Sequence, residues 1–241
     1  LFPYTTLFRS PFQGTVGANF VLDTLKLKKA VILVDNSSDY SKGLSAFFKD
    51  AFTKGGGAIV AEEAYLQKDQ DFKTILTKVK ALNPDVIYVP GYYEEVGKIV
   101  KQARELGMNQ PVVGGDGWDS AKLPEIAGAQ ALNNTFFANH YSPDDTSPAI
   151  KSFVEAYKKE YNETPDAFAA LAYDATMMVI EAMKKANSAD PAKYLPELAK
   201  TEYAVVTAAS ISYDEKGDLK NGTVTVYKVE GGDWKVMETI Q

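Results

Sequence analysis

The chain has 241 residues, of which 45% are hydrophobic and 24% charged, and its net charge is -6. This composition supports a sizeable core in one large domain or two small ones, which excludes a disordered chain. No Lys/Arg run is dense enough for a nucleic-acid partner, zero cysteines exclude disulfides, and no apolar stretch approaches the roughly 20 residues of a membrane span.

The first ten residues, LFPYTTLFRS, lack the basic segment, apolar core and cleavage site of a signal peptide. They resemble the in-frame translation of a widely used short-read sequencing adapter. The alternative is a genuine strand-like start of the domain. We expect residues 1–10 to be non-native, without a functional role, and the native start of the protein to be missing.

Helical and strand-like spacing then alternate along the chain. Helices are expected over residues 13–25, 43–54, 72–79 (after a cap at Asp71) and 94–106, and strands over 30–34, 58–64, 86–89 and 112–113. Gly107 stands where a left-handed C-cap belongs. The alternation predicts an α/β fold with a doubly wound parallel sheet covered on both faces.

Three polar side chains follow the ends of these strands. Tyr40 lies in the polar loop after the first strand, Tyr92 after the third, and Asp116 in a Gly-Asp-Gly turn after the fourth. Open parallel sheets bind ligands at the carboxyl ends of their strands, so the three are predicted to converge on a small-molecule site. In the alternative, Asp116 is an ordinary turn residue, Tyr40 covers the sheet end, and one of Tyr92 and Tyr93 is core.

The neighbours of Asp116 are further candidates. Gly115 and Gly117 let a ligand approach the backbone closely, because no side chain intervenes. Trp118 is either a partly exposed aromatic or a ligand contact. Glycines 55–57 follow a helix and precede a strand, which is the wrong order for a phosphate loop.

The second part of the chain is richer in helices. A strand is expected over residues 135–140, helices over 147–161, 167–186 and 192–199, and hairpin strands over 211–213, 223–229 and 234–240. The helix at 167–186 is nearly apolar all round, which predicts deep burial.

No catalytic motif is present. His140 is the only histidine and has no nucleophile elbow nearby, and Ser45 lacks the final glycine of that motif. An Asp116 and Asp119 carboxylate pair stays formally open, but its spacing does not favour hydrolysis. We therefore expect no enzyme, no metal site and no cofactor.

Seven ordered segments carry a family resemblance. They are QGTVGANF, VILVDNSSDYSKGL, NPDVIYVPGYYEEVGKIVKQARELG, PVVGGDGWDS, YSPDD, PDAFAALAYDA and ISYDEKGDLK. In this order they resemble the branched-chain amino-acid-binding proteins of ABC importers, which are type I periplasmic binding proteins with a two-lobed, Venus flytrap architecture. The resemblance covers the chain after Ser10.

The resemblance implies a division into lobes. Residues 11–140 would be the second ligand-binding lobe, 141–222 a partial first lobe, and 223–241 a return to the second lobe. The family's opening half, which holds the sheet of the first lobe, is absent from this sequence. The helices of residues 147–200 would then lack their natural sheet.

The resemblance also implies ligand contacts. Positions matching Tyr40, Tyr92 and Asp116 face the ligand in the family, and Phe168 matches a first-lobe aromatic beside the side-chain pocket, with a core role as the alternative. Asp116 suits a ligand ammonium, and the tyrosines supply apolar walls. The groups that hold the ligand carboxylate would lie in the absent half.

The implied function is an extracytoplasmic, periplasmic solute-binding protein. It would capture an aliphatic amino acid as a monomer and deliver it to a membrane ABC permease, with or without a lipid anchor. The alternative is the ligand-sensing domain of a receptor or regulator, which an appended helix-turn-helix or membrane span would distinguish.

Overall fold

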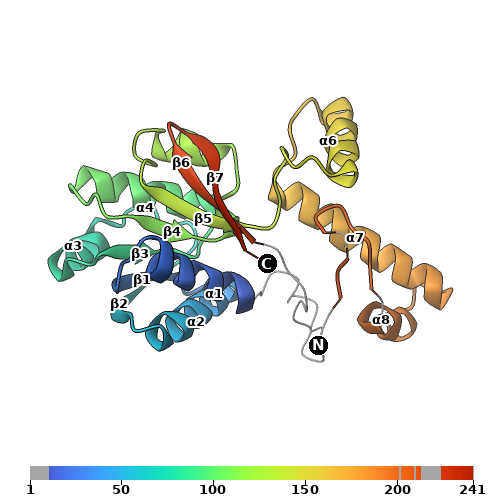
Figure 1. Cartoon of the computed structure of the whole chain (residues 1–241), viewed down its shortest axis with the longest axis horizontal. Helices are drawn as coiled ribbons and strands as arrows, with labels where there is room; N and C mark the ends of the chain where they lie inside the picture. The colour runs from blue at the N-terminus through green and yellow to red at the C-terminus, as the bar shows by residue number, and fades with distance from the viewer. Residues whose placement is uncertain (1–10, 201, 209, 213–223, 241) are drawn as a thin grey trace. The chain divides into compact units, whose positions relative to one another are not determined.

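The computed structural model describes residues 11–200, 202–208, 210–212 and 224–240. They form two compact units, coloured from blue to red along the chain in Figure 1. The sheet unit comprises Pro11–Asn139 and Val224–Ile240, and the helical unit comprises the described part of His140–Thr223. Within these ranges, no helix has both the length and the apolar character needed to cross a membrane.

The sheet unit is built on one seven-stranded sheet. Its strands are β1 (Lys29–Asp35), β2 (Ala58–Tyr65), β3 (Val86–Tyr88), β4 (Val112–Gly114), β5 (Thr135–Asn139), β6 (Val224–Glu230) and β7 (Asp233–Ile240), in the spatial order β2-β1-β3-β4-β5-β6-β7. β1 to β5 run parallel, whereas β6 and β7 pair antiparallel. The predicted α/β fold is confirmed. The antiparallel edge arises because β6 returns from the helical unit, without a crossover helix.

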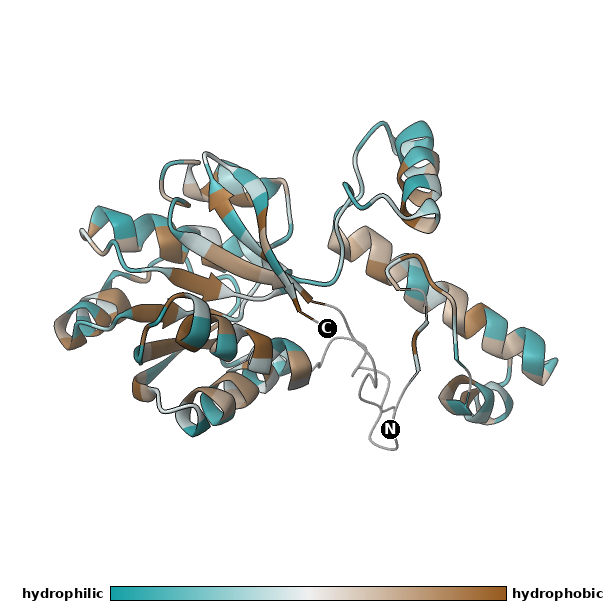
Figure 2. Ribbon diagram, in the orientation of Figure 1, coloured by the Kyte–Doolittle hydropathy of each residue, from teal (hydrophilic) through white to brown (hydrophobic). Residues whose placement is uncertain are grey.

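Helices cover both faces of this sheet. α1 (Pro11–Asn19), the π-helical turn η2 (Phe20–Thr24) and α2 (Asp39–Lys54) pack on one face, and α3 (Lys73–Leu82), α4 (Tyr93–Glu105) and α5 (Lys122–Ala127) on the other. Within β1, Ile32 faces the first layer while Val31 and Leu33 face the second. This period of two places apolar side chains on both faces, and the inner strands β3 and β4 are largely brown in Figure 2.

Local chemistry explains where the helices start and stop. α2 starts four residues earlier than expected because Ser38 is its N-cap and accepts a hydrogen bond from the Ser41 amide. The carboxylate of Asp71 accepts a bond from the Lys73 amide, although the N-cap residue of α3 is Phe72. Gly107 has φ +75, as the predicted left-handed cap requires.

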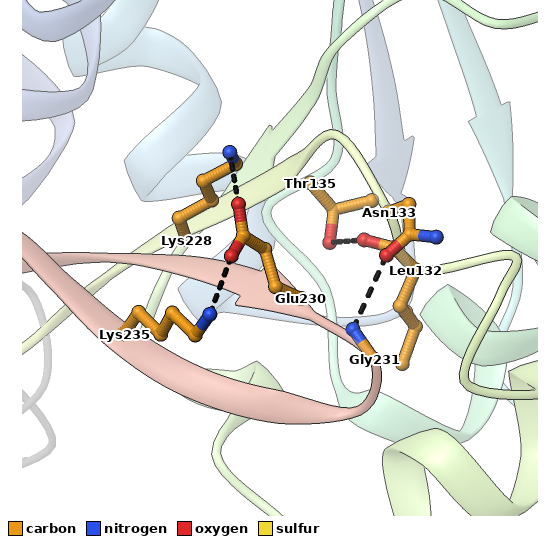
Figure 3. A network of polar contacts seen from close by, with 7 residues as sticks. All are labelled: Leu132, Asn133, Thr135, Lys228, Glu230, Gly231 and Lys235. Carbon is orange, nitrogen blue, oxygen red and sulfur yellow. Dashed lines mark hydrogen bonds and ion pairs between the residues drawn. The ribbon is translucent and has the colours of Figure 1, made fainter.

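The C-terminal hairpin forms one edge of the sheet, and Figure 3 shows the polar contacts around its turn. Glu230 pairs with Lys228 and with Lys235 across the β6–β7 turn, and the two ammonium groups, Lys228 first, lower the pKa of Glu230 to about 2. The Gly231 amide donates to the side-chain oxygen of Asn133 at 3.2 Å. The turn is therefore held to the loop before β5.

The helical unit contains α6 (Pro148–Tyr161), α7 (Ala167–Ala186) and α8 (Pro191–Lys200), with a bridge between Tyr203 and Ile211. Of the expected strand over 211–213, residue 213 lies outside the described residues. The expected deep burial of α7 is wrong, because only one stripe is covered: Ala167, Ala170, Asp174, Met178 and Ala182. Tyr173 is 46% exposed and Ile180 37%. The Tyr173 ring contacts the Phe153 ring, with centroids 5.1 Å apart. An apolar groove of about 760 Å³ runs beside these two rings.

Two glycines in α1 give a matched test of packing against α2. A methyl group at Gly14 would lie 2.7 Å from the Phe47 Cβ, whereas one at Gly17 would lie 3.5 Å from the Tyr88 ring, an ordinary contact. We expect Gly17→Ala to raise the free energy of unfolding by about 0.5–1 kcal/mol and Gly14→Ala to lower it by about 1–3 kcal/mol. Urea unfolding of both variants measures this, and shifts of the same sign would contradict it.

Candidate ligand-binding site

The first part of the site is the start of α2. The Ser41 hydroxyl accepts a hydrogen bond from the Asp35 amide at 2.9 Å, which ties the end of β1 to the helix. Tyr40 therefore lies in the first helical turn, and its expected position in a loop is wrong. The helix start fixes the backbone of Tyr40 directly beyond the carboxyl end of β1.

Tyr40 meets the turn that follows β4. Its hydroxyl donates to Oδ1 of Asp116 at 2.6 Å and accepts from the Gly117 amide at 3.0 Å. Asp116 opens the 3-10 turn η3 (Asp116–Trp118) and is 6% exposed. Burial, and then the charge of Asp116, raise the pKa of Tyr40 well above its usual value. The phenol is therefore protonated at neutral pH, and it donates while the carboxylate accepts.

Tyr92 joins from the third strand end. It is the N-cap residue of α4, and its ring stacks on that of Tyr40 with centroids 5.1 Å apart and planes at 27°. Burial, and then the charge of Asp116, raise its pKa. Tyr93 instead packs partly buried against the core. The predicted convergence of Tyr40, Tyr92 and Asp116 is confirmed, whereas their contact with a ligand stays a prediction.

Asp116 has capacity for a further donor. A carboxylate offers about four lone-pair sites, of which the Tyr40 hydroxyl takes one. No ion pair among the described residues includes Asp116. In the same ranges, no group of three or more His, Asp or Glu side chains could hold a metal ion. The second carboxylate oxygen can therefore accept a hydrogen bond from a further donor.

The glycines beside Asp116 serve packing within the protein. A methyl group at Gly115 would lie 2.7 Å from the Tyr40 hydroxyl, and one at Gly117 would lie 2.7 Å from the Gly91 carbonyl oxygen. A side chain at either position would clash. Glycine is therefore needed for the Tyr40 hydroxyl and the Gly91 backbone to pack against the Asp116 turn. Their predicted contact with a ligand is not needed to explain them.

Trp118 differs from its expected position. Its side chain is fully buried, its indole N–H donates to the Val89 carbonyl at 3.0 Å, and its ring stacks on Phe137. The expectation of a partly exposed aromatic is wrong. The indole packs in the hydrophobic core on the sheet face that α3, α4 and α5 cover. Its side chain is therefore not available to a ligand.

Phe168 belongs to the helical unit. It lies in the first turn of α7, which Asp166 caps by accepting from the Ala169 amide at 2.9 Å, and it is 36% exposed. This exposure is compatible with a pocket-facing aromatic and not with a fully buried core residue. Its place beside the ligand stays a prediction.

Sequence reasoning missed Gln13, which borders the site. It is 1% exposed, and its amide donates to the Ala138 carbonyl at 3.1 Å. Its oxygen would lie 3.4 Å from a methyl group at Gly115. A polar side chain among the mostly small and apolar residues of α1 was the available signal, because a buried amide needs partners.

Comparison with known proteins decides the family. The model of the family described as periplasmic binding protein matches residues 2–233. The chain belongs to this family. Periplasmic binding proteins of this type are not enzymes, so the expectation of no catalytic activity is confirmed.

Similar periplasmic binding proteins confirm the resemblance to branched-chain amino-acid-binding proteins. A Leu/Ile/Val-binding protein of Rhizobium johnstonii is 32% identical over 94% of this chain and 61% of its own length. A leucine-binding protein of Thermotoga maritima has a TM-score of 0.87 at 38% identity, covering 96% of this chain and 65% of its own. A branched-chain amino-acid-binding protein of Streptococcus pneumoniae, solved with isoleucine, has a TM-score of 0.82 at 37% identity, with coverages of 95% and 65%. The chain therefore spans less than two thirds of the length of these relatives.

Proposed function

We propose that this chain is part of an extracytoplasmic solute-binding protein that captures an aliphatic amino acid between two lobes for delivery to an ABC transporter. The observation that carries the proposal is the cluster of Asp116, Tyr40 and Tyr92 at the carboxyl edge of the sheet. Relatives named for binding leucine, isoleucine and valine support this choice of ligand.

In this proposal Asp116 binds the ligand ammonium. A charge-assisted hydrogen bond between a carboxylate and an ammonium is roughly twice as strong as a neutral one. The low exposure of Asp116 strengthens the interaction, because little water competes for the carboxylate. The Tyr40 hydroxyl holds one carboxylate oxygen and leaves the other for the ligand.

The stacked rings of Tyr40 and Tyr92 form a flat wall of the pocket. By the family resemblance alone, Phe168 is a further candidate for an apolar contact with the ligand side chain. The groups that hold the ligand carboxylate come from the part of the relatives that this chain does not span. A ligand that touches both lobes favours the closed form, because only closure completes its contacts.

The closed protein is then presented to the membrane permease. We propose that it acts as a monomer in the periplasm or an equivalent extracytoplasmic space. We also propose that the sheet unit is the second lobe and the helical unit part of the first. This assignment follows the resemblance to branched-chain amino-acid-binding proteins.

Calorimetric titration tests the function. It compares the 241-residue chain with a lobe-restored protein, in which the chain is joined to the part of the Thermotoga maritima relative that it does not cover. We expect the lobe-restored protein to bind one leucine, isoleucine or valine, and to bind 4-methylpentanoate, leucine without its ammonium, about 100-fold more weakly. We expect the 241-residue chain to bind weakly or not at all.

Circular dichroism of both proteins verifies folding in the same experiment. A folded lobe-restored protein that ignores all three amino acids would contradict the proposed function. Tight, stoichiometric binding by the 241-residue chain would contradict the two-lobe site.

A further inference from the structure

Asp119 links three segments of the sheet unit. It directly follows the η3 turn, is 5% exposed, and accepts hydrogen bonds on both carboxylate oxygens. Oδ2 accepts from the Asn139 side-chain amide at 3.1 Å, and Oδ1 accepts from the Trp234 indole N–H at 3.0 Å. The donors come from β5 and β7, which are 20 and 115 residues away in sequence.

Asn139 occupies a special place in the chain. It is the last residue of β5, is 2% exposed, and the chain passes from the sheet unit to the helical unit directly after it. It pairs with Thr225, one residue after the chain returns to the sheet unit at Val224. The two crossings between the units therefore leave from adjacent strand ends, and the Asp119 carboxylate holds one of them.

Asp119 is also tied to the proposed ammonium anchor. Its amide donates to the Asp116 carbonyl at 3.0 Å, so Asp116 and Asp119 are the two ends of one short turn. The indole of Trp118, between them, is fixed to the Val89 carbonyl. Because hydrogen bonds hold this turn together, we expect residues 116–119 to move as one unit. A displacement of the turn is transmitted to the Asn139 side chain through the charge-assisted Asp119–Asn139 hydrogen bond.

We propose that Asp119 is a positioning residue. It couples the turn of residues 116–119, here called the anchor turn, to the chain crossing that follows Asn139. The Asp119–Asn139 bond keeps Asp116 in fixed register with the strand end from which the chain leaves the sheet unit. When the lobes close around a ligand, the chain crossing after Asn139 is involved. The anchor turn sets the position of that crossing through the Asp119–Asn139 bond. The ligand-linked part of this proposal rests on the proposed function, whereas the bond itself does not.

A reciprocal exchange of the two side chains tests the coupling. Asp119→Asn places two side-chain amides against each other, and Asn139→Asp places two carboxylates together. The double variant restores one donor and one acceptor, and the oxygen of the newly introduced amide still accepts from the Trp234 indole. In the lobe-restored protein, we expect each single variant to weaken leucine binding about tenfold and the double variant to return within about threefold of the parent.

A purely structural role predicts a different pattern. Single variants that lower the thermal midpoint but leave leucine affinity unchanged would overturn the coupling. A double variant that binds leucine no better than the weaker single variant would overturn it as well.

Hydrogen exchange on the 241-residue chain separates this proposal from the proposed function, because it needs no ligand. We expect Asp119→Asn to speed amide exchange at residues 116–120 and at residues 139–140 together, and the double variant to slow both again. Faster exchange confined to the turn would reject the coupling. A parent protein that does not bind leucine, but shows the joint exchange response, would reject only the proposed function and its ligand-linked consequence.

Discussion

Asp116→Ala in the lobe-restored protein is expected to weaken leucine binding about 100-fold or more, which corresponds to about 3 kcal/mol. The variant removes the carboxylate that is proposed to bind the ligand ammonium beside the Tyr40–Tyr92 stack. It also leaves the Tyr40 hydroxyl without its acceptor, although that hydroxyl still accepts from the Gly117 amide. Calorimetric titration with leucine measures the change.

Two companion variants isolate the charge. Asp116→Asn keeps the shape and an acceptor for Tyr40, so a loss of affinity close to that of alanine would assign the effect to the charge. Asp50→Ala, an exposed carboxylate of α2 paired with Lys54, is the control and should leave affinity unchanged. Equal affinity of Asp116→Ala and the parent would reject Asp116 as the ammonium anchor.

Asp174→Ala is expected to cause the largest loss of stability in the helical unit. Asp174 is 3% exposed, and its carboxylate accepts from the Val206 amide at 2.8 Å and from the amide and hydroxyl of Thr207 at 2.9 and 2.7 Å. Alanine leaves these donors without their acceptor and detaches the segment from α7. We expect the free energy of unfolding of this unit to fall by about 2–3 kcal/mol.

Hydrogen exchange and urea unfolding measure this effect. Asp166→Ala is the matched control on the same helix, because it removes one N-cap bond at an expected cost of about 1 kcal/mol. An Asp174→Ala variant that is no less stable than Asp166→Ala would contradict the account.

The sequence predicted the sheet unit well because its signals are local. The β-branched runs of β1 and β3, the period of α4 and the cap at Gly107 each follow from a few adjacent residues. Strand ends then predicted which loops would meet, so Tyr40, Tyr92 and Asp116 were found without coordinates. The N-cap at Ser38 was a local signal as well, and overlooking it placed Tyr40 in a loop.

Other features depend on partners far away in the sequence. Trp118 is core because Val89 supplies its acceptor and Phe137 its stacking face. Asp119 offered no local reason for a structural role, since both of its donors come from distant strands. The exposed side of α7 was misjudged for a related reason. An apolar sequence indicates that a helix can be buried, but it does not say which layer will cover it.

The most direct test of the central claim is a crystal structure of the lobe-restored protein with leucine. The account predicts the ligand ammonium within about 3 Å of a carboxylate oxygen of Asp116, with the ligand beside the Tyr40–Tyr92 stack. Leucine bound elsewhere, with Asp116 contacting only groups of the protein, would contradict it.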